Sequence, residues 1–388
     1  YNLTKLPEEK NDTKDFLKSY ALPKEAGSHY RETQDEIKLF NRSLLNNNKI
    51  VAKLRTHLAQ VKSRPDSRSG KLIISIIYYL TLDNLKSTRS TIVEQGGCTL
   101  VLEYLFAASE VKDGIVRPRS TDEEELTTRA QALMALAKIL ILLNPKVIFG
   151  KYNLKSSVPF VLELLKTNDE GEFFESEKFT NVQRLESLLA LTNLSSDLQD
   201  KDLRTFIIEK AFDKYISDLL LETEVPVIQK AAWELVSNLI SEPLMLAKFF
   251  NLQVKENHKR LEILINLIQS TELDLQVVIA GLLANALSSF QMICDIVLKD
   301  YELLEMLLNN IGNVLERQSN EIELVQRLTY ALAGFTYNLS DSKEYLERLK
   351  RNNQIKRGLR VAATSGDPET LEYIGGVLHA ISDPKNSV

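Results

Sequence analysis

The sequence predicts an all-α protein of the α-solenoid class, in which helical repeats stack side by side, from three observations. Leucine is abundant, with 64 residues in a chain of 388, while 14 Gly and 10 Pro are few. Because Gly and Pro supply the tight turns of sheet proteins, their scarcity favours long helices joined by short connections. The chain also exceeds the roughly 250–300 residues at which a single hydrophobic core stops growing, and one helical pattern recurs along it.

The recurring pattern is an apolar helix that ends in an asparagine. The asparagines Asn193, Asn238, Asn285 and Asn338 are 45, 47 and 53 residues apart. Intervals of about 40–47 residues are typical of repeats of two or three helices, which must stack on their neighbours to bury their apolar faces. The segments that carry the pattern are Arg129–Pro145, Arg184–Asp197, Gln229–Glu242, Gln276–Ser289, Arg327–Asp341 and, as a terminal copy, Glu369–Asp383.

From the N-terminus, the polar stretch Tyr1–Ser69 contains one amphipathic helix, predicted from Glu32 to Lys62. From Lys71 onward, helical segments follow one another. Within Thr91–Leu105, the pair Gly96–Gly97 can adopt the left-handed dihedrals that reverse the chain between two helices. This segment resembles the helix junction of armadillo repeats. We therefore expect a helical segment at 1–70 that packs on the array, early armadillo-like repeats at 71–165 and C-terminal repeats at 166–388.

Two connections are too long for tight repeat turns. They are Ser109–Glu125 and Thr167–Thr180, and the second contains the pair Phe173–Phe174 among acidic residues. Loops beyond about 12–15 residues in a compact array are usually functional or disordered. We expect both to be solvated loops, with the phenylalanine pair as a candidate contact for the protein itself or for a partner.

The residue content gives no support for catalysis, a metal or a cofactor. The four histidines lie in no metal-binding or nucleophile motif, and no phosphate-binding loop is present. Cys98 and Cys294 are too few for a disulfide framework, which favours a reducing compartment such as the cytoplasm. The net charge of −5 and the even spread of Lys and Arg make nucleic acid a poor partner. No apolar run is long enough to span a bilayer, so we expect no membrane insertion.

Recognition of a protein segment in a groove remains. In a solenoid, the last helix of each repeat lines the concave side. There, the repeated asparagines could hold an extended peptide backbone through their amide groups, or each could satisfy a neighbouring helix end. Trp233, the single tryptophan, is either an exposed anchor of the kind found at binding hot spots or a packing residue between repeats. The sequence alone decides neither the role of the asparagines nor that of Trp233.

Three segments resemble segments of the UCS family of myosin chaperones, in the same order along the chain. They are Ile76–Glu94, Arg129–Gly150, and Arg184–Lys210 followed by Gln229–Phe250. The resemblance implies an armadillo-like fold and a non-catalytic chaperone whose groove binds the myosin motor domain and supports its folding. The chain resembles a fungal-type member of that family, and such members lack the Hsp90-recruiting tetratricopeptide domain. The resemblance therefore implies Hsp90 only as an indirect partner.

The alternative function is a generic armadillo adaptor that links cytoskeletal partners without chaperone activity. Self-association is left open by the sequence. On either reading, the expected partner-binding residues follow the last helices of the central repeats. They are Asn193, Gln229, Lys230, Trp233, Glu234, Asn238 and Asn285.

Overall fold

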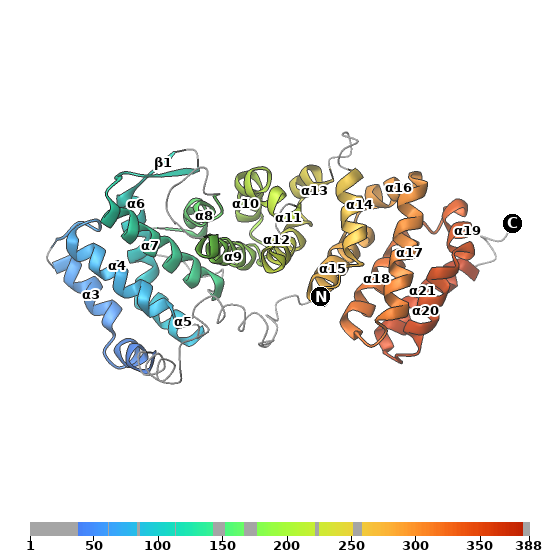
Figure 1. Ribbon diagram of the computed structural model, residues 1–388, viewed down its shortest axis with the longest axis horizontal. Coiled ribbons are helices and arrows are strands. Elements are labelled where there is room, and N and C mark those ends of the chain that lie inside the picture. Colours follow the sequence, from blue (N-terminus) through green and yellow to red (C-terminus); the bar gives the residue numbers. More distant parts are fainter. Residues whose placement is uncertain are drawn as a thin grey trace. The chain divides into compact units, whose positions relative to one another are not determined.

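The computed structural model is built almost entirely of α-helices (Figure 1). It describes residues 38–60, 62–83, 86–112, 114–142, 152–166, 177–221, 225–250 and 258–382. The chain divides into two compact units, Tyr1–Leu235 and Val236–Val388, with the boundary inside helix α12. The prediction of an all-α chain is therefore confirmed.

The first unit stacks its helices in repeats. Helices α5 and α6 pack on each other and on α7, which forms a row with α4 before it and α9 after it. The elements are α3 (Ile50–Gln60), α4 (Arg68–Thr81), α5 (Lys86–Glu94), α6 (Gly97–Ala108), β1 (Ser109–Lys112), β2 (Ile115–Pro118), α7 (Glu123–Leu142), α8 (Leu154–Glu163), α9 (Glu177–Leu194), α10 (Lys201–Ala211), the π-helical turn η2 (Phe212–Ile216), α11 (Ser217–Leu221) and α12 (Pro226–Leu239).

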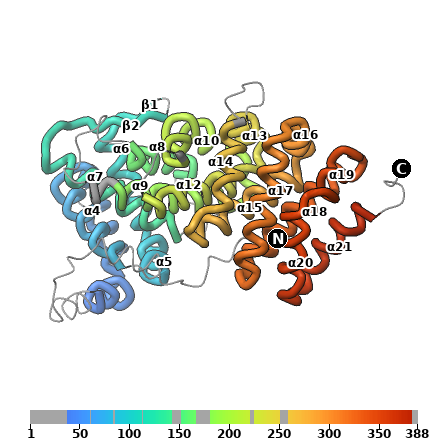
Figure 2. The backbone as a smooth tube through the Cα atoms, turned by 45° about the vertical axis from the view of Figure 1, so that its right-hand side comes forward, coloured from blue at the N-terminus to red at the C-terminus, as the bar shows by residue number. Residues whose placement is uncertain are grey.

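The second unit shows the repeat most clearly. The second helices of its repeats, α14, α17 and α20, stack in one row, and the third helices, α15, α18 and α21, stack in another (Figures 1 and 2). Buried leucines such as Leu283 and Leu332 fill the row of third helices. The elements are α13 (Pro243–Phe249), α14 (His258–Leu267), α15 (Leu273–Ser289), α16 (Gln291–Lys299), α17 (Tyr301–Arg317), α18 (Ile322–Asn338), α19 (Lys343–Arg351), α20 (Asn353–Ala363) and α21 (Pro368–Ser382).

The helix predicted from Glu32 to Lys62 is interrupted in the structure. Residues 38–46 are helical, the chain then turns, and α3 begins at Ile50 after Lys49 with φ +49°. The side chain of Gln95 fixes this break: its Nε2 donates to the Leu45 carbonyl (2.8 Å), and its Oε1 accepts from the Val51 amide (3.1 Å). One distant glutamine thus satisfies backbone groups at both helix ends, which a local pattern cannot reveal.

The connection Ser109–Glu125 also differs from the expected solvated loop. It folds into an antiparallel hairpin of β1 and β2, with Val111 opposite Val116 and Gly114 at the tip with φ +79°. Val116 is buried, because the hairpin packs through β1 on α6 and through β2 on α8. In the sequence, Val111 on one side and Ile115 and Val116 on the other side of the turn pair Asp113–Gly114 are a hairpin signal that the loop prediction overlooked.

The turn at Gly96 is confirmed. Gly96 has φ +84° directly before α6, so α5 and α6 are joined through a left-handed residue, as the sequence predicts. The pair Phe173–Phe174 lies outside the described residues. Among the described residues no single helix is long and apolar enough to cross a bilayer; α15 and α16 meet the criteria only as a pair, bent by 100°.

Candidate partner-binding surface

The expected partner-binding residues lie on three helices. Asn193 is on α9, Asn285 is on α15, and the other five are on α12. Since the boundary between the compact units follows Leu235, Asn238 and Asn285 belong to the second unit and the rest to the first. Helices α9 and α12 lie side by side in both views (Figures 1 and 2).

Two of the repeated asparagines, Asn193 and Asn338, cap the end of a neighbouring helix. Asn193 Nδ2 donates to the Leu140 carbonyl in the last turn of α7 (2.6 Å). Asn338 Nδ2 donates to the Leu287 carbonyl at the end of α15 (2.8 Å). The last four carbonyls of a helix lack intrahelical partners, so an amide from the next repeat supplies one. For Asn193, the amide N–H is therefore used inside the protein, as the second reading of the sequence describes.

We expect this capping to contribute to stability. Replacing Asn338 with Ala should lower the free energy of unfolding of the second unit by about 1–2 kcal/mol, because the Ser288 carbonyl loses its amide donor and the Leu287 carbonyl keeps only the weaker Cys294 thiol donor. Asn285 is a matched control in the same unit: it is half-buried and has no hydrogen-bond partner among the described residues. Its replacement with Ala should change stability by less than about 0.5 kcal/mol. Urea unfolding followed by circular dichroism measures both; equal losses would contradict the capping role.

Helix α12 presents a mixed surface. The side chains of Lys230 and Glu234 are 25% and 32% exposed and form an i, i+4 ion pair at 3.9 Å. Gln229 is tied to α11, since its Nε2 donates to the Leu220 carbonyl (3.0 Å). Trp233 is only 1% exposed. The interpretation of Trp233 as an exposed anchor is therefore wrong. Its indole packs in the interior together with the buried aliphatic residues of α12.

Two helices, α4 and α18, carry exposed apolar residues that were not predicted from the sequence. On α4, Leu72, Ile76 and Tyr79 are 60%, 38% and 56% exposed and lie at i, i+4 and i+7. On α18, Tyr330 and Tyr337 are 40% and 80% exposed. The face opposite the core is thus apolar as well. The sequence of α4 has apolar residues on most sides of the helix. Such a pattern is also typical of a fully buried helix, so it does not show by itself whether Leu72, Ile76 and Tyr79 are exposed.

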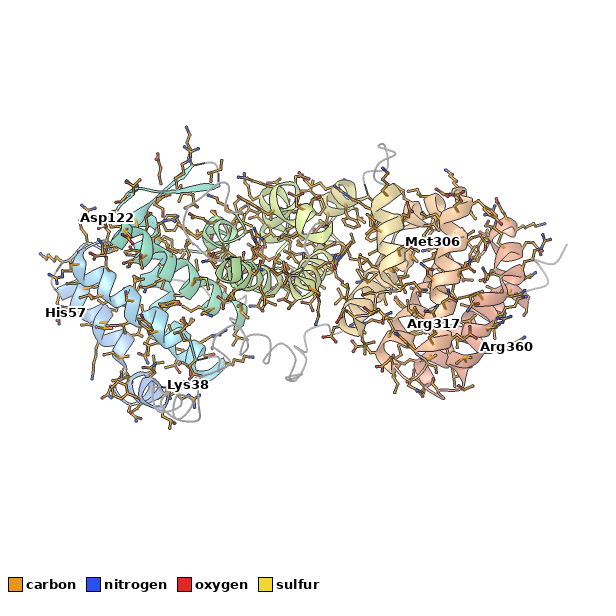
Figure 3. The ribbon with its side chains drawn as sticks, viewed as in Figure 1. Lys38, His57, Asp122, Met306, Arg317 and Arg360 are labelled. Atoms are coloured by element: carbon orange, nitrogen blue, oxygen red, sulfur yellow. The ribbon has the colours of Figure 1, made fainter. Side chains whose placement is uncertain are left out.

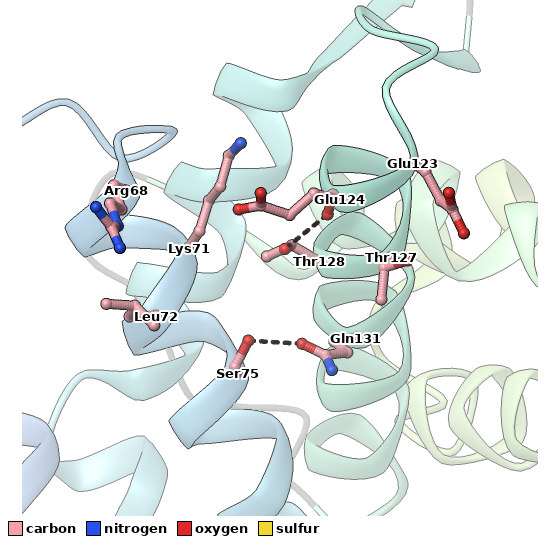
Figure 4. A pocket seen from close by; sticks show the side chains of 9 residues that line it. All are labelled: Arg68, Lys71, Leu72, Ser75, Glu123, Glu124, Thr127, Thr128 and Gln131. Atoms are coloured by element: carbon pink, nitrogen blue, oxygen red, sulfur yellow. Dashed lines mark hydrogen bonds between the residues drawn. The ribbon is translucent and has the colours of Figure 1, made fainter.

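A shallow cleft of about 570 Å³ lies between α4 and α7 (Figure 4). Ser75 Oγ donates to Gln131 Oε1 across it (2.7 Å), and Leu72 points away from α7. At its rim Lys71 pairs with Glu125 (3.0 Å); this hydrogen bond raises the pKa of Lys71, while hydrogen bonds from Ser120 and Lys71 lower the pKa of Glu125. The cleft is polar, charged and open, which suits a surface contact rather than an enclosed reaction.

The described residues bring no catalytic set together. His57 lies exposed on α3 (Figure 3). His379 lies exposed on α21. Within the described ranges there is no group of three or more His, Cys, Asp or Glu side chains that could hold a metal ion. Cys98 and Cys294 are buried and free, and burial raises the pKa of each thiol to about 12.

The fold and surface define a helical-repeat protein of the armadillo type. No family model matches the chain. SWI5-dependent HO expression protein 4 of Saccharomyces cerevisiae is 30% identical over 398 aligned positions, which cover 98% of this chain and 47% of that protein. The crystal structure of She4p matches with a TM-score of 0.75 and 26% identity, covering 92% of this chain and 47% of that one. The chain belongs to the UCS family, and it spans about half the length of these relatives.

A further solved structure shares the fold at lower identity. It is a structure of the UNC-45 chaperone, a protein whose molecular features are critical for binding and folding muscle myosin. It matches with a TM-score of 0.63 and 19% identity, covering 92% of this chain and 34% of the UNC-45 chain. The armadillo-like α-solenoid predicted from the sequence is thereby confirmed.

Proposed function

We propose that this chain is a non-catalytic, myosin-directed chaperone that binds the myosin motor domain and supports its folding and stability. The observation that carries the proposal is the similarity to SWI5-dependent HO expression protein 4 along 98% of the chain. The UNC-45 chaperone, which has the same fold, binds and folds muscle myosin. Exposed apolar residues on α4 and on α18 supply the kind of surface that can hold a partly unfolded client.

In the first unit, the proposed contact residues are the two partly exposed charges of α12, Lys230 and Glu234. In the second unit, they are Asn238 and Asn285. Gln229 and Asn193 support those of the first unit through the carbonyls they cap. In the same proposal the protein acts in the cytoplasm, Hsp90 takes part only indirectly, and self-association is a feature to be measured. The boundaries at residues 70/71 and 165/166 stay predictions.

The test heats a myosin motor domain with and without the protein and follows aggregation by light scattering. Wild-type protein should suppress aggregation at near-equimolar ratio. Lys230→Glu should raise the concentration needed by roughly tenfold, which corresponds to about 1.4 kcal/mol. The matched control is Lys343→Glu, the same charge change at an exposed position on α19. Undiminished aggregation in the presence of wild-type protein would overturn the chaperone function.

The adaptor alternative predicts a different pair of results. An adaptor would bind the native motor in a pull-down and leave aggregation of the heated motor unchanged. A third protein that aggregates on heating but is not a myosin, such as citrate synthase, separates a myosin-directed activity from general holding of unfolded chains.

A further inference from the structure

Helices α18 and α21 of the second unit form a surface that carries exposed tyrosines. Tyr337 is 80% exposed and Tyr330 is 40% exposed, two turns apart on the face of α18 opposite its buried residues Leu328 and Phe335. The ring of Tyr330 lies 5.1 Å from that of Tyr373 on α21, tilted by 60°. Tyrosine supplies a large, stiff contact area with a polar end, and it is enriched among binding hot spots.

The two helices are held together beside these rings. Gln326 of α18 donates from Nε2 to both carboxylate oxygens of Asp367 at 3.1 Å. Asp367 also accepts from the Thr370 amide at 2.8 Å, which caps the start of α21. Hydrogen bonds from Thr370 and Gln326 lower the pKa of Asp367. The Asp367 carboxylate therefore links Gln326 of α18 to the first turn of α21.

The charge beside the rings is negative. Glu369 and Glu372 of α21 are exposed, four residues and one residue before Tyr373, and neither forms an ion pair with the described residues. The nearby cation of α18, Arg327, is already engaged by Glu323 (2.8 Å) and by the Val277 carbonyl (2.8 Å). A Lys or Arg side chain of a partner could form ion pairs with these carboxylates and cation–π contacts with the tyrosine rings.

Open space adjoins the rings at Gly376. A Cβ added there would meet nothing within 4 Å. At the corresponding position of the preceding repeat, Gly334, a Cβ would lie 2.5 Å from Ser288 Cβ of α15. Glycine inside a helix costs roughly 1 kcal/mol relative to Ala. At Gly334 the contact with α15 explains the glycine, whereas at Gly376 no described residue uses the space.

We propose that Tyr330, Tyr337 and Tyr373, flanked by Glu369 and Glu372, bind an extended polypeptide segment that carries Lys or Arg. The segment's cations lie between the carboxylates and the ring faces, and its backbone passes over Gly376. The negative charge selects this occupant over an acidic peptide or a nucleic acid. The proposal stands whether or not the partner is myosin.

The test uses fluorescein-labelled twelve-residue peptides of alternating Lys and Ala, Gln and Ala, or Glu and Ala, with fluorescence anisotropy at physiological salt. We expect the Lys peptide to bind and the other two to bind at least about tenfold more weakly. Glu369→Gln with Glu372→Gln should weaken binding of the Lys peptide by at least about tenfold. Gly376→Leu should do the same without lowering the melting temperature, since the leucine fills open space in a helix.

The matched control is Glu302→Gln with Glu347→Gln, which removes two exposed charges from α17 and α19. It should leave the dissociation constant within about twofold. The proposal is overturned by equal binding of the Lys and Gln peptides, by absence of binding to wild-type protein, or by equal losses in the two double variants. A dimer that dissociates in Gly376→Leu would assign the surface to a second copy and also overturn it.

Discussion

Replacing Gly358 with Ala should destabilise the second unit by roughly 2–3 kcal/mol, the usual cost of forcing an extra carbon into a packed contact. Helices α17 and α20 cross at a pair of glycines. A Cβ at Gly358 would lie 2.5 Å from the Gly312 carbonyl oxygen, and one at Gly312 would lie 2.6 Å from the Gln354 carbonyl oxygen. Both obstacles are backbone atoms, so no side chain can rotate away and the helices must separate.

The measurement is thermal unfolding combined with hydrogen exchange of α17 and α20. For a unit of this size the melting temperature should fall by on the order of 5–10 °C, and exchange should rise first in these two helices. Gly375→Ala is the matched control, since a Cβ there meets nothing within 4 Å. It should stabilise the unit by up to about 1 kcal/mol. If both variants behaved alike, the close crossing would be disproved.

Replacing Arg129 with Met should destabilise the first unit by about 3–5 kcal/mol, the cost of leaving a buried charge without its partner. The Arg129 and Glu163 side chains are 2% and 8% exposed. Arg129 Nη1 donates to Glu163 Oε1 (2.7 Å), Nη2 donates to Oε2, and Nε donates to Ser109 Oγ (2.8 Å). The pair thus ties α7 to α8 and to the start of the hairpin.

Urea unfolding of the first unit measures this loss. The double variant Arg129→Met with Glu163→Met should recover a large part of it, because no uncompensated charge remains. The surface pair of Lys155 with Asp202 (2.9 Å; 36% and 80% exposed) is the comparison. Lys155→Met should cost at most about 1 kcal/mol. Similar losses at the buried and the exposed pair would contradict the assigned role of burial.

The repeated asparagines show how much of the candidate site could be predicted from the sequence. Their spacing marks helices near whose C-terminal ends they lie: Asn193 on α9, Asn238 on α12, Asn285 on α15 and Asn338 on α18. It did not give their partners: Asn193 bonds to a carbonyl 53 residues earlier and Asn338 to one 51 residues earlier. Whether such an amide faces a client or a neighbouring helix end depends on the packing of one repeat on the next.

Charged residues show the same limit. In the sequence, Arg129 and Lys138 belong to an apolar segment, while Glu163 and Glu186 are ordinary helix carboxylates that would be placed in solvent. The structure buries all four as two pairs, Arg129 with Glu163 and Lys138 with Glu186. The members of a pair are 34 and 48 residues apart, so no local period connects them.

The sequence by itself determined the helical repeat, its approximate period, the left-handed turn at Gly96 and the absence of a recognisable catalytic motif. These follow from local periodicity and from the backbone freedom of glycine, which each segment carries alone. Only the tertiary structure decided the break that Gln95 imposes before Ile50, the burial of Trp233 and the exposure of Tyr337. Each of these depends on which surface of a helix the neighbouring repeat covers, and that is set by contacts between residues far apart in the chain.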